Sequence, residues 1–123
     1  MDVLLVDDDP IMHVIVQQIL EQATGGVCKM IKATEWLEAA RHANSRKFDL
    51  ILLDNLLSRS ITAQVSVPLI RKSRHRSPIA IISSDIRVDY LSHPSILGVD
   101  YIVDKMHLAR FLRDQARLLS ILQ

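Results

Sequence analysis

The sequence predicts an α/β domain built on a parallel, doubly wound sheet. Four short runs are almost wholly apolar and end in polar or charged residues: 3–6, 48–53, 78–82 and 101–103. Segments with helical spacing of apolar residues separate these runs, and strands that alternate with helices form a parallel sheet through right-handed crossovers. Because the carboxyl ends of parallel strands share one edge, the polar residues after the runs are expected to meet there.

The first apolar run, residues 3–6, leads directly into Asp7, Asp8, Asp9 and Pro10. Such a short run is typical of a strand buried on both faces. Pro10 suits the first turn of a helix, and Asp9 suits the N-cap before it. Asp7 and Asp8 are then left at the strand end, where crowded carboxylates are tolerated in water or beside a cation. Taken alone, this stretch also allows both to be solvated loop acids.

The next elements follow from the spacing of apolar residues. Residues 11–23 carry an apolar stripe at helical spacing, and the glycines at 25–26 end that helix. Residues 27–32 alternate imperfectly, as expected of a more exposed strand. A second helix is predicted over residues 34–44, followed by a buried strand at 48–55.

The second half of the chain gives a less regular pattern. Residues 56–75 are expected to be irregular because Pro68 falls inside what should be the third helix. The basic run at 71–76 is predicted to be a solvated helix end and loop. A short helix is predicted over 85–91, and an amphipathic helix over 108–123 closes the domain.

Composition limits the class of protein. The chain has 123 residues, 49% of them hydrophobic, which fits one domain over residues 1–123. A formal net charge of +1 gives no reason to expect a nucleic-acid partner, and no run is apolar enough for a membrane span. The first strand starts too early for a signal peptide, and a lone cysteine, Cys28, fits a reducing compartment, so a cytoplasmic protein is expected. The five histidines show no ligand spacing and are predicted to be structural or surface residues.

The polar residues at the expected sheet edge suggest phosphoryl chemistry. Of the carboxylates Asp7, Asp8 and Asp54, two can hold Mg²⁺ through oxygen atoms, while the third acts as a nucleophile towards phosphorus. Lys105 can pair with one oxygen of the transferred group, and the Ser83 hydroxyl can donate to another. Catalysis at such a site consists of positioning and charge neutralisation.

The same residues carry a family resemblance. An acid pair at Asp7 and Asp8, Asp54 in Leu-Leu-Asp-Asn, Ser83 and Lys105 occur in the order and spacing of response-regulator receiver domains of two-component signalling. The chain resembles that family over nearly its full length. The resemblance implies a flavodoxin-like (βα)5 three-layer sandwich with a five-stranded parallel sheet of order 2-1-3-4-5. It also implies that Asp54 is the phosphoacceptor.

The resemblance implies further expectations. Mg²⁺ would be held by Asp7, Asp8, Asp54 and the backbone carbonyl of Asn55. The phosphoryl donor would be a histidine kinase or a histidine phosphotransfer protein, and the chain would be a signalling module rather than an enzyme. The signal would pass to a downstream protein effector by contacts on one face: Arg87, Tyr90, Tyr101, Arg110, Arg113 and Arg117. Homodimerisation through the last helix is left open.

The chain departs from the family pattern at several positions. Ser58 stands where a proline is common, Thr62 where a glycine is common, and Met106 where a proline follows the lysine. The aromatic position before the lysine holds Ile102. These departures leave the acceptor residues intact and affect the coupling between Ser83 and an aromatic residue that relays phosphorylation in the family.

Two alternatives remain open at this stage. In the first, the chain is a pseudo-receiver that serves as an interaction module without phosphorylation, as the departures over residues 56–68 and at Ile102 suggest. In the second, it is an aspartate-nucleophile phosphohydrolase that uses Asp7, but the chain is short for that class and Asp54 would have no role.

Overall fold

The computed structural model describes residues 1–58 and 61–122. Its centre is a five-stranded sheet of order β2-β1-β3-β6-β7 in which all neighbouring strands are parallel. The strands are β1 (Asp2–Val6), β2 (Lys29–Ala33), β3 (Leu50–Asp54), β6 (Ile79–Ser83) and β7 (Tyr101–Asp104). Since β4 and β5 lie outside this sheet, the order corresponds to 2-1-3-4-5 and confirms the flavodoxin-like prediction.

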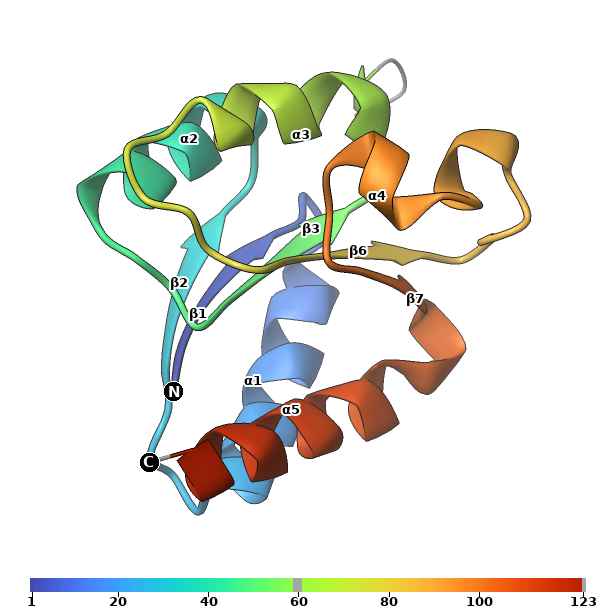
Figure 1. The fold of residues 1–123 in the computed structure, drawn as a ribbon. Coiled ribbons are helices and arrows are strands. Elements are labelled where there is room, and N and C mark those ends of the chain that lie inside the picture. Colours follow the sequence, from blue (N-terminus) through green and yellow to red (C-terminus); the bar gives the residue numbers. More distant parts are fainter. Residues whose placement is uncertain (59–60, 123) are drawn as a thin grey trace.

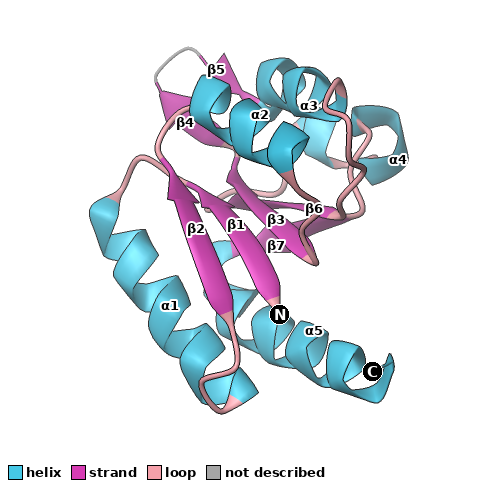
Figure 2. Ribbon diagram, turned by 90° about the vertical axis from the view of Figure 1, so that its left-hand side faces the viewer, coloured by secondary structure: helices cyan, strands magenta, loops and turns pink. Residues whose placement is uncertain are grey.

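Helices cover both faces of the sheet and complete a three-layer sandwich (Figure 1). One face carries α1 (Pro10–Thr24) and α5 (Leu108–Leu122), which pack against each other. The other face carries α2 (Trp36–Ser45), α3 (Ala63–Arg71) and the short α4 (Pro94–Leu97), as Figure 2 shows from the side. Within the described ranges, no helix is both long and apolar enough to cross a lipid bilayer.

Alternation along the strands builds two separate cores. In β1, Val3 and Leu5 belong to the core under α1 and α5, whereas Leu4 and Val6 belong to the core under α2 and α3. All four side chains are completely buried, and complete burial of each contributes roughly 1.5–3 kcal/mol. The sheet is therefore held from both faces, and this fixes the position of the strand ends.

The start of α1 matches the prediction from sequence. The Asp9 side chain accepts a hydrogen bond of 2.9 Å from the Ile11 N–H, and Pro10 occupies the first turn. Gly25 ends the helix in the left-handed region at φ 64°, which glycine adopts without steric cost. The tight entry into α1 keeps Asp7 and Asp8 in a short loop at the sheet edge.

Two of the predicted helices differ from the structure. The second begins at Trp36 rather than at residue 34, because the Glu38 carboxylate accepts a hydrogen bond of 2.8 Å from the Thr34 N–H and holds that residue outside the helix. The predicted helix over 85–91 is wrong. Only a 3₁₀ turn at Asp89–Leu91 is present, and the regular turn of α4 comes after it.

The region after β3 is irregular, as predicted, but it contains structure that the sequence did not indicate. Strands β4 (Leu56–Ser58) and β5 (Ile61–Thr62) form a small antiparallel pair before α3. Strands this short show no readable periodicity, which explains why they were missed. Pro68 lies inside α3, a helix of 9 residues.

One residue of the basic run is structural rather than solvated. The Arg71 guanidinium donates to the carbonyl oxygens of Gly98 and Ser77, at 3.0 and 2.6 Å. It also forms an ion pair of 3.0 Å with Asp100. Arg71 therefore ties the end of α3 to the segments that enter β6 and β7. The prediction of a solvated run over 71–76 is wrong at this position, because a long side chain at a helix end can reach carbonyls of distant loops.

Candidate functional site

The carboxyl edge of the sheet gathers the predicted acids. Asp7 and Asp8 follow β1, and Asp54 is the last residue of β3. Asp7, Asp8 and Asp54 each offer a carboxylate oxygen, and these atoms lie within 4.8 Å of one another. Residues 47 positions apart in sequence thus form one anionic cluster, as parallel topology predicts.

Asp7 is the most constrained member of the cluster. Its residue surface is completely buried, and its Oδ1 accepts a hydrogen bond of 2.9 Å from the Asp9 N–H. Its Oδ2 is buried and has no hydrogen-bond donor among the described residues. Burial raises the pKa of Asp7, while the Asp9 N–H and Lys105 act in the opposite direction. A buried, unsatisfied carboxylate oxygen is costly unless a cation or a proton meets it.

Asp54 is also strongly perturbed. It is 7% exposed, and burial together with the negative charge of Asp7 raises its pKa to about 6. Lys105 and a long contact of 3.4 Å from the Leu56 N–H favour the charged form, but they do not offset burial. Asp54 therefore lies in an environment that favours neutralisation of its carboxylate.

A positive charge faces this carboxylate from β7. Lys105 follows Asp104, the last residue of the strand, and its Nζ lies 3.6 Å from Asp54 Oδ1. The Asp104 side chain accepts from the Met106 N–H at 2.9 Å and so shapes the turn that carries the lysine. The Lys105 side chain is partly exposed, so its ammonium group has room to move towards negative charge that is added to Asp54.

Ser83 reaches the same edge but is engaged elsewhere. It is the last residue of β6, and its hydroxyl lies 3.0 Å from the Asp85 carbonyl and 3.2 Å from the Asp85 N–H. The neighbouring Asp85 side chain pairs with Arg87 at 3.2 Å. The position of Ser83 matches the expectation, whereas its hydroxyl must turn away from Asp85 to serve a ligand at the acid cluster.

Two further residues support the site, and sequence reasoning did not assign them this role. His13 is buried, and its Nε2 lies 2.6 Å from the Asp7 carbonyl oxygen, so it fixes the backbone of the acid loop. The spacing of His13 with the buried residues Val16 and Leu20 of α1 was a readable signal of burial. Tyr90 contacts the Asn55 side chain at 2.8 Å, a pairing that no local pattern could reveal.

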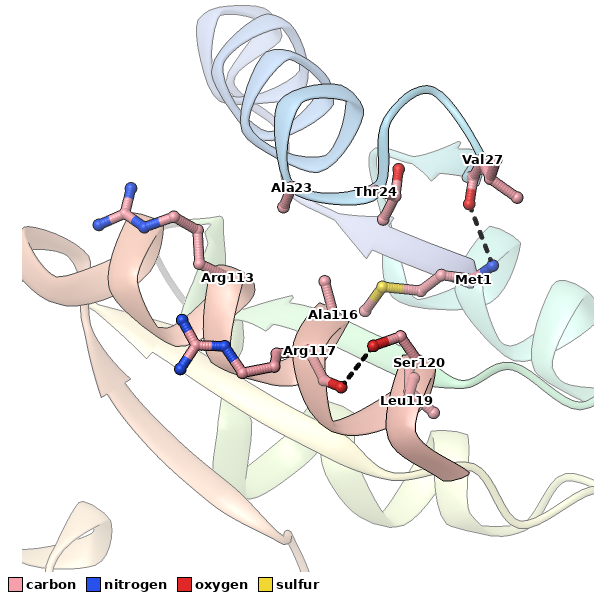
Figure 3. Close-up of a pocket in the computed structure, with 9 residues that line it drawn as sticks. All are labelled: Met1, Ala23, Thr24, Val27, Arg113, Ala116, Arg117, Leu119 and Ser120. Carbon is pink, nitrogen blue, oxygen red and sulfur yellow. Dashed lines mark hydrogen bonds between the residues drawn. The ribbon is translucent and has the colours of Figure 1, made fainter. Parts of the chain in front are cut away.

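Two surface cavities lie at different distances from the acid cluster. A cavity of about 520 Å³ adjoins it and is lined by Asp8, Pro10, His13, Val14, Lys32 and Thr34. Another cavity, of about 450 Å³, lies between the C-terminal ends of α1 and α5 (Figure 3). Its lining contains no carboxylate, and the guanidinium groups of Arg113 and Arg117 point away from Met1. Of the acid cluster, only Asp8 lines the first cavity, which therefore borders the cluster on one side.

Sequence comparison agrees with this geometry. A family model described as the response regulator receiver domain matches residues 3–117. A curated relative, the transcription factor prr1 of Schizosaccharomyces pombe, is 34% identical over an alignment 129 residues long, which covers 98% of this chain and 22% of that protein. The chain therefore spans about a fifth of that relative's length.

Solved structures share the fold. A two-component response regulator from Clostridium difficile matches with a TM-score of 0.77 and 21% identity, over 97% of this chain and 98% of that one. The receiver domain of a sensor histidine kinase from Pseudomonas aeruginosa PAO1, described with magnesium in its active site cleft, matches with a TM-score of 0.74 and 20% identity, over 94% and 97%. With the family match over most of its length, the chain belongs to the response regulator receiver domain family.

Proposed function

We propose that the chain accepts a phosphoryl group on Asp54 from the phosphohistidine of a histidine kinase or histidine phosphotransfer protein. The observation that carries the proposal is the convergence of Asp7, Asp8 and Asp54 within 4.8 Å, with Lys105 facing Asp54 at 3.6 Å. Family membership favours a signalling module over the phosphohydrolase alternative. A stable acyl phosphate is then the output state rather than a reaction intermediate.

The donor set fits Mg²⁺. Hard divalent cations prefer oxygen ligands, and Mg²⁺ typically binds few protein carboxylates together with a phosphate oxygen. Asp7, Asp8 and Asp54 would hold the ion with the Asn55 backbone carbonyl, and Asp7 Oδ2 is a buried oxygen that lacks a partner. When bound, the ion would neutralise negative charge that Lys105 alone does not balance. Burial, and after it the charge of Asp7, raises the pKa of Asp54 to about 6, so a bound cation would favour the ionised form of this carboxylate.

The residues of the chain have distinct parts in the transfer. An Asp54 carboxylate oxygen attacks phosphorus, so that a P–O bond forms while the P–N bond to the donor imidazole breaks and its electron pair returns to nitrogen. Lys105 pairs with an oxygen of the transferred group. The Ser83 hydroxyl, released from Asp85, donates to another oxygen. His13 keeps the acid loop in place through the Asp7 carbonyl.

A direct test uses a small phosphodonor such as acetyl phosphate with Mg²⁺. We expect intact-mass spectrometry to show a gain of one phosphoryl group, which peptide mapping places on Asp54. Asp54→Asn should remove the gain completely because the amide is not a nucleophile, whereas Asp114→Asn on the exposed side of α5 should keep it. A wild-type protein that remains unlabelled where a known receiver is labelled would favour the pseudo-receiver alternative.

We propose that the donor protein docks on the first turns of α1. Ile11 and Val14 are 65% and 57% exposed there, although both are apolar. Val14 also lines the cavity beside Asp8, so a partner seated on this surface could present a phosphohistidine to Asp54. Exposed apolar residues beside a polar site are typical of a protein contact.

Val14→Glu should separate docking from chemistry. A buried charge in the interface should slow phosphotransfer from a histidine phosphotransfer protein by about five-fold or more, the range of a residue worth over about 1 kcal/mol. Labelling by acetyl phosphate should stay unchanged, because the small donor needs no interface. Val27→Glu is the matched control, since Val27 is 74% exposed but lines the remote cavity. Equal transfer rates in both variants would exclude this surface.

For output we propose the exposed face of α5, where Arg110, Arg113 and Arg117 all point to solvent. Tyr101 lies beneath this helix and packs edge-on against Phe111 with ring centroids 5.1 Å apart. A downstream protein with an acidic surface would match the three guanidinium groups.

A further inference from the structure

A pair of side chains links the phosphoacceptor strand to the segment after β6. The Tyr90 hydroxyl lies 2.8 Å from Asn55 Nδ2, which donates to it, and 3.0 Å from Asn55 Oδ1, to which it can donate. Asn55 directly follows Asp54, and Tyr90 lies 35 residues further along the chain in the 3₁₀ turn. The contact therefore joins the reactive end of β3 to a part of the fold that has little regular structure.

Asn55 is held from several sides. Its backbone N–H donates to the Ile82 carbonyl at 2.9 Å, and its Oδ1 also accepts from the Ala63 N–H at 3.3 Å. The residue is buried. The Asn55 backbone is thus bonded to β6, and its side chain connects the first residue of α3 with Tyr90. The backbone carbonyl of Asn55 is a proposed cation ligand. A shift of the Asn55 backbone on cation binding would therefore also displace its hydrogen-bond partners.

Tyr90 in turn anchors a weakly structured segment. Its ring packs against the core under α2 and α3, next to the buried Leu91. The segment from 84 to 98 otherwise has only the four-residue helix α4, where Ile96 is 82% exposed. A cavity of about 280 Å³ lies beside Tyr90.

The relay residues common in the family are not in place here. The aromatic position is Ile102, and the Ser83 hydroxyl is engaged with Asp85. We propose that the Tyr90 hydroxyl is instead the positioning group that couples the Asp54 site to residues 85–98 through Asn55. This inference rests on the proposed function. We expect loss of the hydroxyl to weaken ligand binding at the acid cluster, because Tyr90 holds Asn55, whose backbone carbonyl is a proposed cation ligand.

The test compares Tyr90→Phe with the wild-type chain. Calorimetric titration with Mg²⁺, alone and with beryllium fluoride as a phosphoryl mimic, should show an affinity about three- to ten-fold lower in the variant, the range of one hydrogen bond. Beryllium fluoride should shift the backbone NMR signals of residues 85–98 in the wild-type chain and shift them by less than half as much in Tyr90→Phe. Ser45→Ala, which removes an exposed hydroxyl at the C-terminal end of α2, is the control and should behave like the wild type.

A double-mutant cycle shows whether Tyr90 acts through Asn55. In an Asn55→Ala background, Tyr90→Phe should cause no further loss of Mg²⁺ affinity, whereas independent roles would give additive losses. Equal affinities and equal NMR shifts in wild type and Tyr90→Phe would overturn the coupling while leaving phosphorylation at Asp54 intact. A wild-type chain that binds neither Mg²⁺ nor beryllium fluoride would overturn the proposed function, and the coupling with it.

Discussion

Asp7→Asn is expected to weaken Mg²⁺ binding by about 100-fold or more and, at the same time, to stabilise the metal-free fold. Replacing a residue that only orients a metal ligand costs up to about 100-fold in affinity, so loss of a proposed ligand should cost at least that. The gain in stability follows from the burial of Asp7, whose Oδ2 finds no donor among the described residues. A neutral amide removes the buried charge and can donate to a neighbouring carboxylate.

The gain in the free energy of unfolding should be about 1–3 kcal/mol, the usual cost of an unsatisfied buried polar group. Urea unfolding at neutral pH without divalent ions measures the stability, and calorimetry measures the metal affinity. Two variants carry the same chemical change. Asp8→Asn, at an exposed proposed ligand, should lose affinity and gain less stability than Asp7→Asn, and Asp9→Asn should leave the affinity unchanged, since asparagine caps a helix as well as aspartate. A destabilised Asp7→Asn protein would contradict the electrostatic account.

The stability of the metal-free chain is expected to fall as the pH rises from about 4 to about 7. The pKa of Asp54 is raised from 3.8 to about 6, so the folded chain binds a proton that the unfolded chain has already released in this range. Stability decreases with pH wherever the folded state holds more protons. The loss should approach about 3 kcal/mol above pH 7, because one pKa unit corresponds to 1.36 kcal/mol. Burial shifts the pKa of Asp7 in the same direction and adds to the effect.

Urea unfolding between pH 4.5 and 7.5 tests this dependence. Asp54→Asn should flatten most of the slope, whereas Asp114→Asn on the surface should preserve it. Added Mg²⁺ should recover stability at pH 7.5 if it binds only the folded chain. If the free energy of unfolding of the metal-free chain instead rises with pH over this range, the pKa values of the buried carboxylates are not raised in the folded state.

The residues that sequence analysis placed well are those fixed by topology. Asp7, Asp54 and Lys105 are far apart in the chain, but each ends or directly follows a strand with a clear apolar run, and parallel strands bring their ends to one edge. The Asp9 cap and the Gly25 stop were also predicted, because each depends only on its immediate neighbours. The chemical roles of these residues stay proposals that the experiments above address.

What could not be predicted depends on contacts between weakly patterned segments. The β4–β5 pair has strands too short to show a period, and residues 85–91 contain enough apolar residues to resemble a helix without forming one. The link between Asn55 and Tyr90 arises only when the 3₁₀ turn meets the end of β3. Ser83 was placed at the correct strand end, but its attachment to Asp85 depends on the local turn.

The division of the interior into two cores has a consequence for how such a domain can diversify. Val3 and Leu5 face one set of helices and Leu4 and Val6 the other, so the sheet works as a partition. Amino-acid changes that remodel α1 and α5 to suit new protein contacts need not disturb the packing of α2, α3 and α4. The surface that recognises one partner can therefore change in sequence, while the opposite half of the molecule, including the hydrogen bonds between Tyr90 and Asn55, is preserved.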